Sequence, residues 1–326
     1  MSLNSSPGDV RFEPLLDRPL NPRLALVFPG QGAQRVGMGK ELLDFSPAAR
    51  SVFEEADAAL GERISRLCFE GPDEALTDTA NAQPAILATT AAYLAAAIEA
   101  GTLRERPAYV AGHSLGQYSA LLAAGSLSLT DALTVVRARG RIMARESEMN
   151  RGTMAAILGM DESTVQQICR GSGAEPANYN GPTQVVVGGS IDAVERATTL
   201  AKERGGKVLP VKVVGAFHTS LMRGASTAFA PIISGVPLLD AVIPVVSNVA
   251  ALPLTDAAAI RADLIEQVAQ PVLWAQSIAW MLEHGVRTFV EIGPGRTLSG
   301  MLKRIAPDAE AMNIDSVDAL SGVLHV

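Results

Sequence analysis

A serine set between two glycines is the most informative feature of this sequence: Gly112-His113-Ser114-Leu115-Gly116. It lies between an extended apolar run, residues 107–112, and a run with helical character, residues 115–124. Small residues two positions away on each side allow the sharp strand-to-helix turn of a nucleophile elbow, which exposes the hydroxyl at the sheet edge. The helix that follows turns free N–H groups toward negative charge beside the serine. The pattern indicates acyl transfer, unless Gly-x-Ser-x-Gly has arisen by chance in a glycine-rich chain.

The segments before and after the elbow predict a mostly parallel sheet. Residues 23–28 are a continuous apolar run that ends in the glycine-rich turn 29–32, as expected of a strand buried on both faces. Arg35 stands where a dinucleotide-binding Gly-x-Gly-x-x-Gly motif needs its third glycine, which argues against that motif. Further strands are expected at 109–111, 242–247 and 288–291, with helices between them. This alternation predicts an α/β fold with a covered sheet.

The chain from about residue 152 to 214 follows a different order of elements. Its apolar patterning predicts strand, helix, strand, strand, helix, strand, which is the split βαβ arrangement of a ferredoxin-like unit. We therefore expect a disordered leader at 1–22 and a large catalytic α/β domain formed by 23–150 and 215–326. A ferredoxin-like small domain at 151–214 is inserted between its two parts.

Composition narrows the class of protein. No apolar run in the 326 residues reaches the roughly 18 residues of a membrane span, and the N-terminal residues lack a secretion-signal pattern. A formal net charge of −7 argues against nucleic acid as a partner. Cys68 and Cys169 have no metal-ligand spacing, so we expect core thiols and no metal site. These features predict a cytoplasmic protein, which we expect to be a monomer.

A serine hydroxyl needs a base to take its proton, and histidine is the usual one near neutral pH. The chain has four histidines. His113 is adjacent to the serine and cannot easily reach its hydroxyl, whereas His284 and His325 lie in a helix end and in the tail. His218, at the seam between the expected domains, is the candidate base. The alternative is a packed or surface histidine.

Arg139 interrupts the apolar line of a helix expected over residues 130–148. Arg137, Arg141 and Arg145 fall on another line, which we expect to be a solvated face. A buried arginine is costly unless a carboxylate or several carbonyls meet it. Arg139 therefore predicts either a buried ion pair or a contact made in function.

Six segments, in order, resemble the malonyl-CoA:acyl carrier protein transacylases of fatty-acid synthesis. They are Phe28-Pro29-Gly30-Gln31-Gly32-Ala33-Gln34, Gly112-His113-Ser114-Leu115-Gly116, Arg139-Gly140, Ala177-Asn178-Tyr179-Asn180 followed by Gln184-Val185-Val186, Gly215-Ala216-Phe217-His218, and Glu291-Ile292-Gly293-Pro294-Gly295. The resemblance covers about residues 24–305. It implies an α/β-hydrolase-like large domain with a ferredoxin-like insertion.

The resemblance also implies roles for individual residues. Ser114 would attack the malonyl thioester, and His218 would accept and return the proton. The backbone N–H groups of Gln31 and Leu115 would form the oxyanion hole, and Arg139 would bind the free malonyl carboxylate. The substrate would be malonyl-CoA, with no bound cofactor, and the partner an acyl carrier protein.

Other positions would support the site. The main-chain carbonyl of Gln267 would orient the histidine, and Asn180, with Asn248, would help to position these groups. Phe217, like Leu115, resembles the bulk that accompanies selection of malonyl over methylmalonyl. The family often has glutamate where this chain has Gln117, which leaves open any ion pair from that position.

Three other functions remain as alternatives. The protein could be a discrete acyltransferase serving a polyketide synthase, an acyl-thioester hydrolase on the same elbow, or a catalytically silent module that binds a carrier protein. Because such carriers are acidic, a basic dock is expected among Lys202, Lys207, Lys212, Arg296, Lys303 and Arg304.

Overall fold

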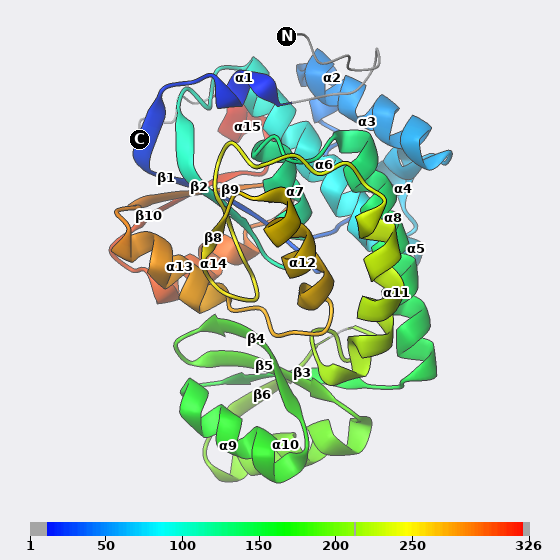
Figure 1. Cartoon of the computed structure of the whole chain (residues 1–326), viewed down its shortest axis with the longest axis vertical. Helices are drawn as coiled ribbons and strands as arrows, with labels where there is room; N and C mark the ends of the chain where they lie inside the picture. Colours follow the sequence, from blue (N-terminus) through cyan, green and yellow to red (C-terminus); the bar gives the residue numbers. More distant parts are fainter. Residues whose placement is uncertain (1–11, 212, 322–326) are drawn as a thin grey trace.

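The computed structural model describes residues 12–211 and 213–321 as a mixed α/β protein with two sheets (Figure 1). The larger sheet has the strand order β10-β9-β1-β2-β7-β8, and every neighbouring pair is parallel except β7 and β8. Its strands are β1 (Leu20–Phe28), β2 (Arg106–Gly112), β7 (Val245–Val246), β8 (Pro253–Leu254), β9 (Thr288–Ile292) and β10 (Glu310–Ile314). The predicted mostly parallel sheet is confirmed.

Helices cover both faces of this sheet. They are α1 (Glu13–Leu16), α2 (Leu42–Phe45), α3 (Pro47–Leu60), α4 (Ile64–Glu70), α5 (Asp73–Thr77), α6 (Thr79–Glu99), α7 (Gly116–Ala123), α8 (Leu129–Met149), α11 (Arg223–Ser234), α12 (Ala257–Gln267), α13 (Trp274–Glu283), α14 (Thr297–Ile305) and α15 (Val317–Leu320), with a 3-10 turn at Ser220–Met222. None of the helices in the described ranges is long and apolar enough to cross a membrane.

The apolar run of β1 is buried on both sides. Leu24, Leu26 and Phe28 join one core with helices α2–α8, α11 and α12, whereas Ala25 and Val27 join a second core with α13 and α14. Because successive side chains of a strand point to opposite faces, only a strand covered on both faces needs such a run. β1 therefore lies in the interior of the larger sheet, and its carboxyl end is packed on both faces.

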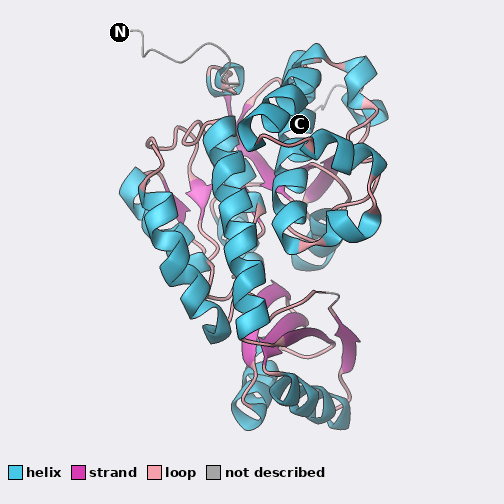
Figure 2. Cartoon of the chain, turned by 90° about the vertical axis from the view of Figure 1, so that its right-hand side faces the viewer, coloured by secondary structure: helices cyan, strands magenta, loops and turns pink. Residues whose placement is uncertain are grey.

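The second sheet lies at one end of the molecule, with two helices packed on it (Figures 1 and 2). Its strands are β3 (Thr153–Leu158), β4 (Glu175–Gly181), β5 (Gln184–Gly189) and β6 (Lys207–Pro210), in the antiparallel order β4-β5-β3-β6. Helices α9 (Glu162–Ser172) and α10 (Ile191–Glu203) share a separate apolar core with it.

A short main-chain bridge joins strand β4 of the second sheet to the segment that precedes α13. Tyr179 N–H donates to the Val272 carbonyl at 2.9 Å, and Val272 N–H donates to the Ala177 carbonyl at 2.9 Å. Residues 178 and 272 thereby pair in parallel outside the named strands. The edge strand β4 is thus tied directly to the segment that precedes α13.

The structure corrects three expectations. Residues 12–22 of the expected leader are ordered: they form α1 and the start of β1, because Phe12 and Leu15 are buried in the main core; residues 1–11 lie outside the described part of the chain. The strand expected at 242–247 is only Val245–Val246. Arg137 is buried rather than solvated, donates to the Ala80 carbonyl and forms an ion pair with Glu62.

The two cysteines are buried free thiols, as expected. Cys68 belongs to the main core and Cys169 to the core of the second sheet. Burial raises the pKa of each thiol to about 12. Both thiols are therefore protonated at neutral pH and have no nucleophilic character.

Candidate active site

Ser114 lies at the turn between β2 and α7, as the sequence predicts. Its φ of 52° is in the left-handed region, which is rare for a residue with a side chain. A Cβ at Gly112 would lie 1.9 Å from the carbonyl carbon of Gly116, and a Cβ at Gly116 would lie 2.1 Å from the Phe28 oxygen. Both glycines are therefore required for the elbow to pack against the end of β1.

Ser114 is in hydrogen-bond contact with His218. The Ser114 Oγ lies 2.7 Å from His218 Nε2, and His218 Nδ1 lies 2.7 Å from the main-chain oxygen of Gln267. A carbonyl can only accept, so Nδ1 carries the ring hydrogen and Nε2 is free to accept from the hydroxyl. The pair can thus transfer a proton from serine to imidazole, with a carbonyl in the position of the usual carboxylate.

The surroundings of His218 keep its imidazole neutral. Burial, reinforced by the nearby positive charge of Arg139, lowers its pKa to about 3. A neutral ring is the form that accepts the serine proton. The imidazole of His218 is therefore in the form that can accept the serine proton even well below neutral pH.

This shift predicts the pH dependence of Ser114 acylation. Since activity requires neutral His218, and its lowered pKa keeps the ring neutral in acid, the rate should be constant from about pH 8 to about pH 5. Single-turnover acylation by p-nitrophenyl acetate measures this when product release is followed at the wavelength where p-nitrophenol and p-nitrophenolate absorb equally. A loss of rate with a midpoint near the ordinary histidine value of about 6.5 would contradict it.

The side chain of Arg139 projects from α8 toward the Ser114–His218 pair. The guanidinium is buried and donates from Nη2 to Ser114 Oγ at 3.1 Å and to Gln267 Oε1 at 3.0 Å, and from Nη1 to Gln83 Oε1 at 2.8 Å. In the described part of the chain no carboxylate forms an ion pair with it, and its Nε–H has no acceptor. Of the two sequence alternatives, the buried ion pair is therefore wrong, and a cation with spare donors faces the serine.

The backbone N–H groups of Gln31 and Leu115, the predicted oxyanion-hole donors, belong to two neighbouring turns that line the cavity. Phe28 and Gly112 are paired neighbours at the ends of β1 and β2, and His113 N–H donates to the Phe28 carbonyl at 3.1 Å. The turn holding Gln31 and the elbow holding Leu115 consequently lie side by side. Among the described residues, no hydrogen bond uses the N–H of Gln31 or Leu115, so both are available as donors.

The remaining predicted residues surround this group. Asn180 Oδ1 lies 2.8 Å from His113 Nε2. Asn180 therefore contacts His113, which the sequence analysis rejected as the base, and not His218. Asn248 Oδ1 accepts from the Ser114 N–H at 2.7 Å, and its Nδ2 donates to the Gly112 carbonyl at 2.8 Å. Phe217 is buried and lines the cavity. Asn248 therefore supports the elbow itself.

The cavity above Ser114 has a volume of about 200 Å³. Segments next to the larger sheet and strands of the second sheet both line it. The lining includes Gln31, Ser114, Arg139, Asn180, Phe217 and His218. Side chains from the second sheet and its connection, such as Met154, Val186 and Val211, add an apolar wall. The cavity thus combines a polar floor with an apolar side.

Sequence reasoning missed two contributors to the floor. Gln83 accepts from Arg139, and its only signal in the sequence was a polar side chain at a position where helix α6 is surrounded by apolar residues. Asp263 accepts from Gln117 Nε2 at 2.6 Å beneath the site. No spacing in the sequence links residue 263 to residue 117, since the two meet only when α12 packs near the start of α7.

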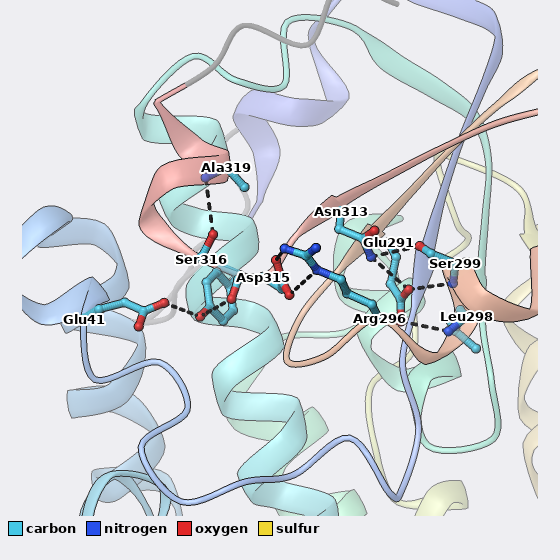
Figure 3. Close-up of polar contacts among 10 residues, drawn as sticks. Glu41, Glu291, Arg296, Leu298, Ser299, Asn313, Asp315, Ser316 and Ala319 are labelled. Atoms are coloured by element: carbon cyan, nitrogen blue, oxygen red, sulfur yellow. Dashed lines mark hydrogen bonds and ion pairs between the residues drawn. The ribbon is translucent and has the colours of Figure 1, made fainter.

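Glu291 explains the last of the six sequence motifs (Figure 3). Its carboxylate leaves β9 and accepts from the N–H groups of Leu298 and Ser299, at 3.1 and 2.7 Å, and from Asn313 Nδ2 at 3.1 Å. The first two are unpaired amides at the start of α14, where negative charge is stabilised. Because Thr297, Leu298 and Met301 line the cavity, Glu291 fixes one of its walls.

The change Glu291→Gln is expected to lower the free energy of unfolding by about 2 kcal/mol, because the amide nitrogen cannot accept from a helix N–H in this buried position. Urea unfolding followed by circular dichroism measures it. Glu310→Gln on the neighbouring strand is the matched control, since an exposed carboxylate should contribute less than about 0.5 kcal/mol. Equal losses for the two variants would contradict the role of Glu291.

A serine on a strained elbow, a neutral histidine and an unpaired buried cation together define a serine-dependent acyl-transfer site on an α/β fold. The family profile described as "Acyl transferase domain" matches residues 25–318. The chain is 45% identical over 289 residues to the malonyl CoA-acyl carrier protein transacylase of Bacillus subtilis (strain 168), covering 87% of this chain and 90% of that protein.

Solved structures agree with this match. The acyl-carrier-protein-S-malonyltransferase of Bartonella henselae superposes with a TM-score of 0.87 at 39% identity, over 91% of this chain and 96% of that one. A malonyl-transacylase solved in complex with its type II polyketide acyl-carrier protein gives a TM-score of 0.88 at 36% identity, over 91% and 97%. The chain belongs to the acyl transferase family of malonyl-CoA:acyl carrier protein transacylases.

Proposed function

We propose that the protein moves a malonyl group from coenzyme A to the phosphopantetheine thiol of an acyl carrier protein through an ester on Ser114. The observation that carries this proposal is the buried Arg139 guanidinium beside the Ser–His pair. A cation with no carboxylate partner in the described chain is costly unless the substrate supplies an anion. A malonyl thioester ends in such an anion, whereas an acetyl thioester does not.

The first half-reaction forms the ester. Ser114 Oγ attacks the thioester carbonyl while its proton passes to His218 Nε2, and the Gln31 and Leu115 N–H groups stabilise the oxyanion. The carbon–sulfur bond then breaks, and His218 returns the proton to the sulfur of coenzyme A. The imidazolium formed midway is stabilised through Nδ1–H by the Gln267 carbonyl.

The second half-reaction repeats these steps with the carrier's thiol as nucleophile. His218 takes the thiol proton, the sulfur attacks the Ser114 ester, and the proton goes back to Ser114 Oγ. Arg139 holds the malonyl carboxylate throughout. Phe217, beside the acyl group, would leave little room for an α-methyl substituent, and Asn180 would hold His113 at the cavity wall.

The carrier could belong to fatty-acid or to polyketide synthesis. The Bacillus subtilis relative is a malonyl CoA-acyl carrier protein transacylase, and one structural neighbour is a complex with a type II polyketide acyl-carrier protein. We propose that the carrier approaches near α14, whose residues line the cavity and which carries exposed Lys303 and Arg304. The cytoplasmic location and monomeric state remain predictions.

We also propose the domain organisation expected from the sequence, with a large domain at 23–150 and 215–326 and a small domain at 151–214. The separate apolar cores and the antiparallel order β4-β5-β3-β6, with two helices, support a ferredoxin-like small domain. The elbow at the end of a parallel strand supports a hydrolase-like large domain.

Intact-mass spectrometry tests the proposed function. The protein is mixed with malonyl-CoA, and a stable adduct with the mass of one malonyl group should map to Ser114. Addition of a holo acyl carrier protein should move that group to the carrier, and comparison of fatty-acid with polyketide carriers identifies the partner. Release of free malonate at the same rate with and without either carrier would contradict the proposal and favour a hydrolase.

A further inference from the structure

A chain of buried hydrogen bonds runs away from Arg139 beneath the site. Arg139 Nη2 donates to Gln267 Oε1 at 3.0 Å, Gln267 Nε2 donates to Gln117 Oε1 at 2.6 Å, and Gln117 Nε2 donates to Asp263 Oδ2 at 2.6 Å. The other oxygen of Asp263 accepts from the Ser247 hydroxyl. We call this chain, Arg139–Gln267–Gln117–Asp263, the amide relay.

The two ends of the amide relay fix its direction. A guanidinium can only donate, so Gln267 must present its oxygen to Arg139. The Ser247 hydroxyl oxygen already accepts from the N–H groups of Val249 and Ala250, so its hydrogen points to Asp263. A carboxylate that accepts on both oxygens requires the nitrogen of Gln117 to face it. Both amides therefore have one orientation that satisfies every partner.

Asp263 is the one carboxylate of the amide relay, and the two glutamine amides separate it from the Arg139 cation. All four members are buried, with exposed fractions of 0% for Gln117 and Gln267, 1% for Arg139 and 9% for Asp263. In such surroundings hydrogen bonds polarise one another along a chain. Burial raises the pKa of Asp263, and the hydrogen bonds from Ser247 and Gln117 oppose that rise; in its ionised form Asp263 strengthens the acceptor that Gln267 presents to Arg139.

We propose that Asp263 and Gln117 are positioning residues: Asp263 orients the Gln117 amide, whose oxygen holds Gln267 in place and thereby holds the Arg139 guanidinium toward the acyl group. The inference rests on the proposed function, because it assigns the orientation of the residue that would bind the malonyl carboxylate. It also gives Gln117 a role in this chain. A glutamate at position 117 would place two carboxylates in contact, where they cannot both ionise.

Reciprocal substitution tests the amide relay. Asp263→Asn removes the acceptor-only end, so the Gln117 amide gains a second orientation, in which its nitrogen instead of its oxygen faces Gln267 Nε2. Gln117→Glu puts a carboxylate against Asp263. The double variant Q117E/D263N exchanges carboxylate and amide between the two positions. The carboxylate at position 117 then accepts from Gln267 and from the new amide at position 263, so the net charge and every hydrogen bond are kept, and only the bond between 117 and 263 is reversed.

Two readouts separate positioning from a loss of fold. The first is the ratio of Ser114 acylation by malonyl-CoA to acylation by p-nitrophenyl acetate, an ester without a carboxylate. The second is the affinity for free malonate, measured by calorimetry, which needs no transfer. Each single variant should lower both quantities at least about tenfold, as expected for hydrogen bonds to charged groups. The double variant should recover to within about threefold of the wild type.

Asp256→Ala is the matched control on the same helix. It removes the N-terminal cap of α12 without touching the amide relay, so thermal stability should fall while the ratio stays unchanged. If either single variant fails to fold, recovery in the double variant still decides the question. Unchanged ratios in the single variants, additive losses in the double variant, or no malonate binding by the wild type would overturn the inference. Wild-type protein that binds malonate but transfers nothing to a carrier would instead contradict the proposed function.

Discussion

Replacing Ser114 by alanine should lower malonyl transfer to the carrier by at least about 10⁴-fold, because no other group can form the covalent ester. The hydroxyl is 2.7 Å from His218 Nε2, and alanine has the same Cβ as serine at this φ of 52°, so the fold should persist. Transfer of radiolabelled malonyl to a holo carrier protein measures the effect. The adduct seen by intact mass should vanish with it.

His218→Ala and the double variant complete this test. Since the two side chains act as one proton-transfer unit, removing both should cost about as much as removing Ser114 alone. Losses that multiply would mean that the serine and histidine act independently, which would contradict the proposed mechanism. A circular-dichroism spectrum matching that of the wild type would show that each variant is folded.

Replacing Arg139 by alanine should lower malonyl transfer by about 10³-fold, while acetyl transfer should fall by less than about tenfold. A malonyl carboxylate left in the buried site without its cation loses its charge-assisted hydrogen bonds, whereas an acetyl group never made them. Measurement of kcat/KM with malonyl-CoA and acetyl-CoA on the same carrier gives both numbers.

Arg137→Ala is the matched control for this prediction. Arg137 is two residues away on α8 and also buried, but its guanidinium contacts Ala80, Asn81 and Glu62 rather than the cavity. Its loss should reduce stability and leave the malonyl-to-acetyl ratio unchanged. Equal losses for both substrates in Arg139→Ala would refute binding of the malonyl carboxylate by Arg139.

The sequence predicted the features that depend on local patterning. The elbow follows from glycine spacing, and the central strand follows from a continuous apolar run. Arg139 was recognisable because a charge interrupts an apolar helix face. Each of these signals is contained in a stretch of chain short enough to be read without knowing the fold.

Features that depend on packing between distant segments were not predictable in this way. Arg137 lies on a face that looks solvated until the start of α6 covers it, and the hydrogen bond of Gln117 with Asp263 forms only when the fold brings α12 close to the start of α7. The carbonyl of Gln267 carries no side-chain signal, so only the family resemblance indicated it. The ordered residues 12–22 were missed because two buried apolar side chains suffice to fix so short a segment.

The main-chain bridge between residues 178 and 272 limits how a bulky thioester can enter. Swinging the second sheet away from the first would break both peptide hydrogen bonds at 2.9 Å and separate Asn180 from His113. Opening the cavity by a hinge motion between the two sheets would therefore cost these hydrogen bonds. We therefore expect coenzyme A and the carrier's prosthetic arm to reach the cavity without separation of the two sheets.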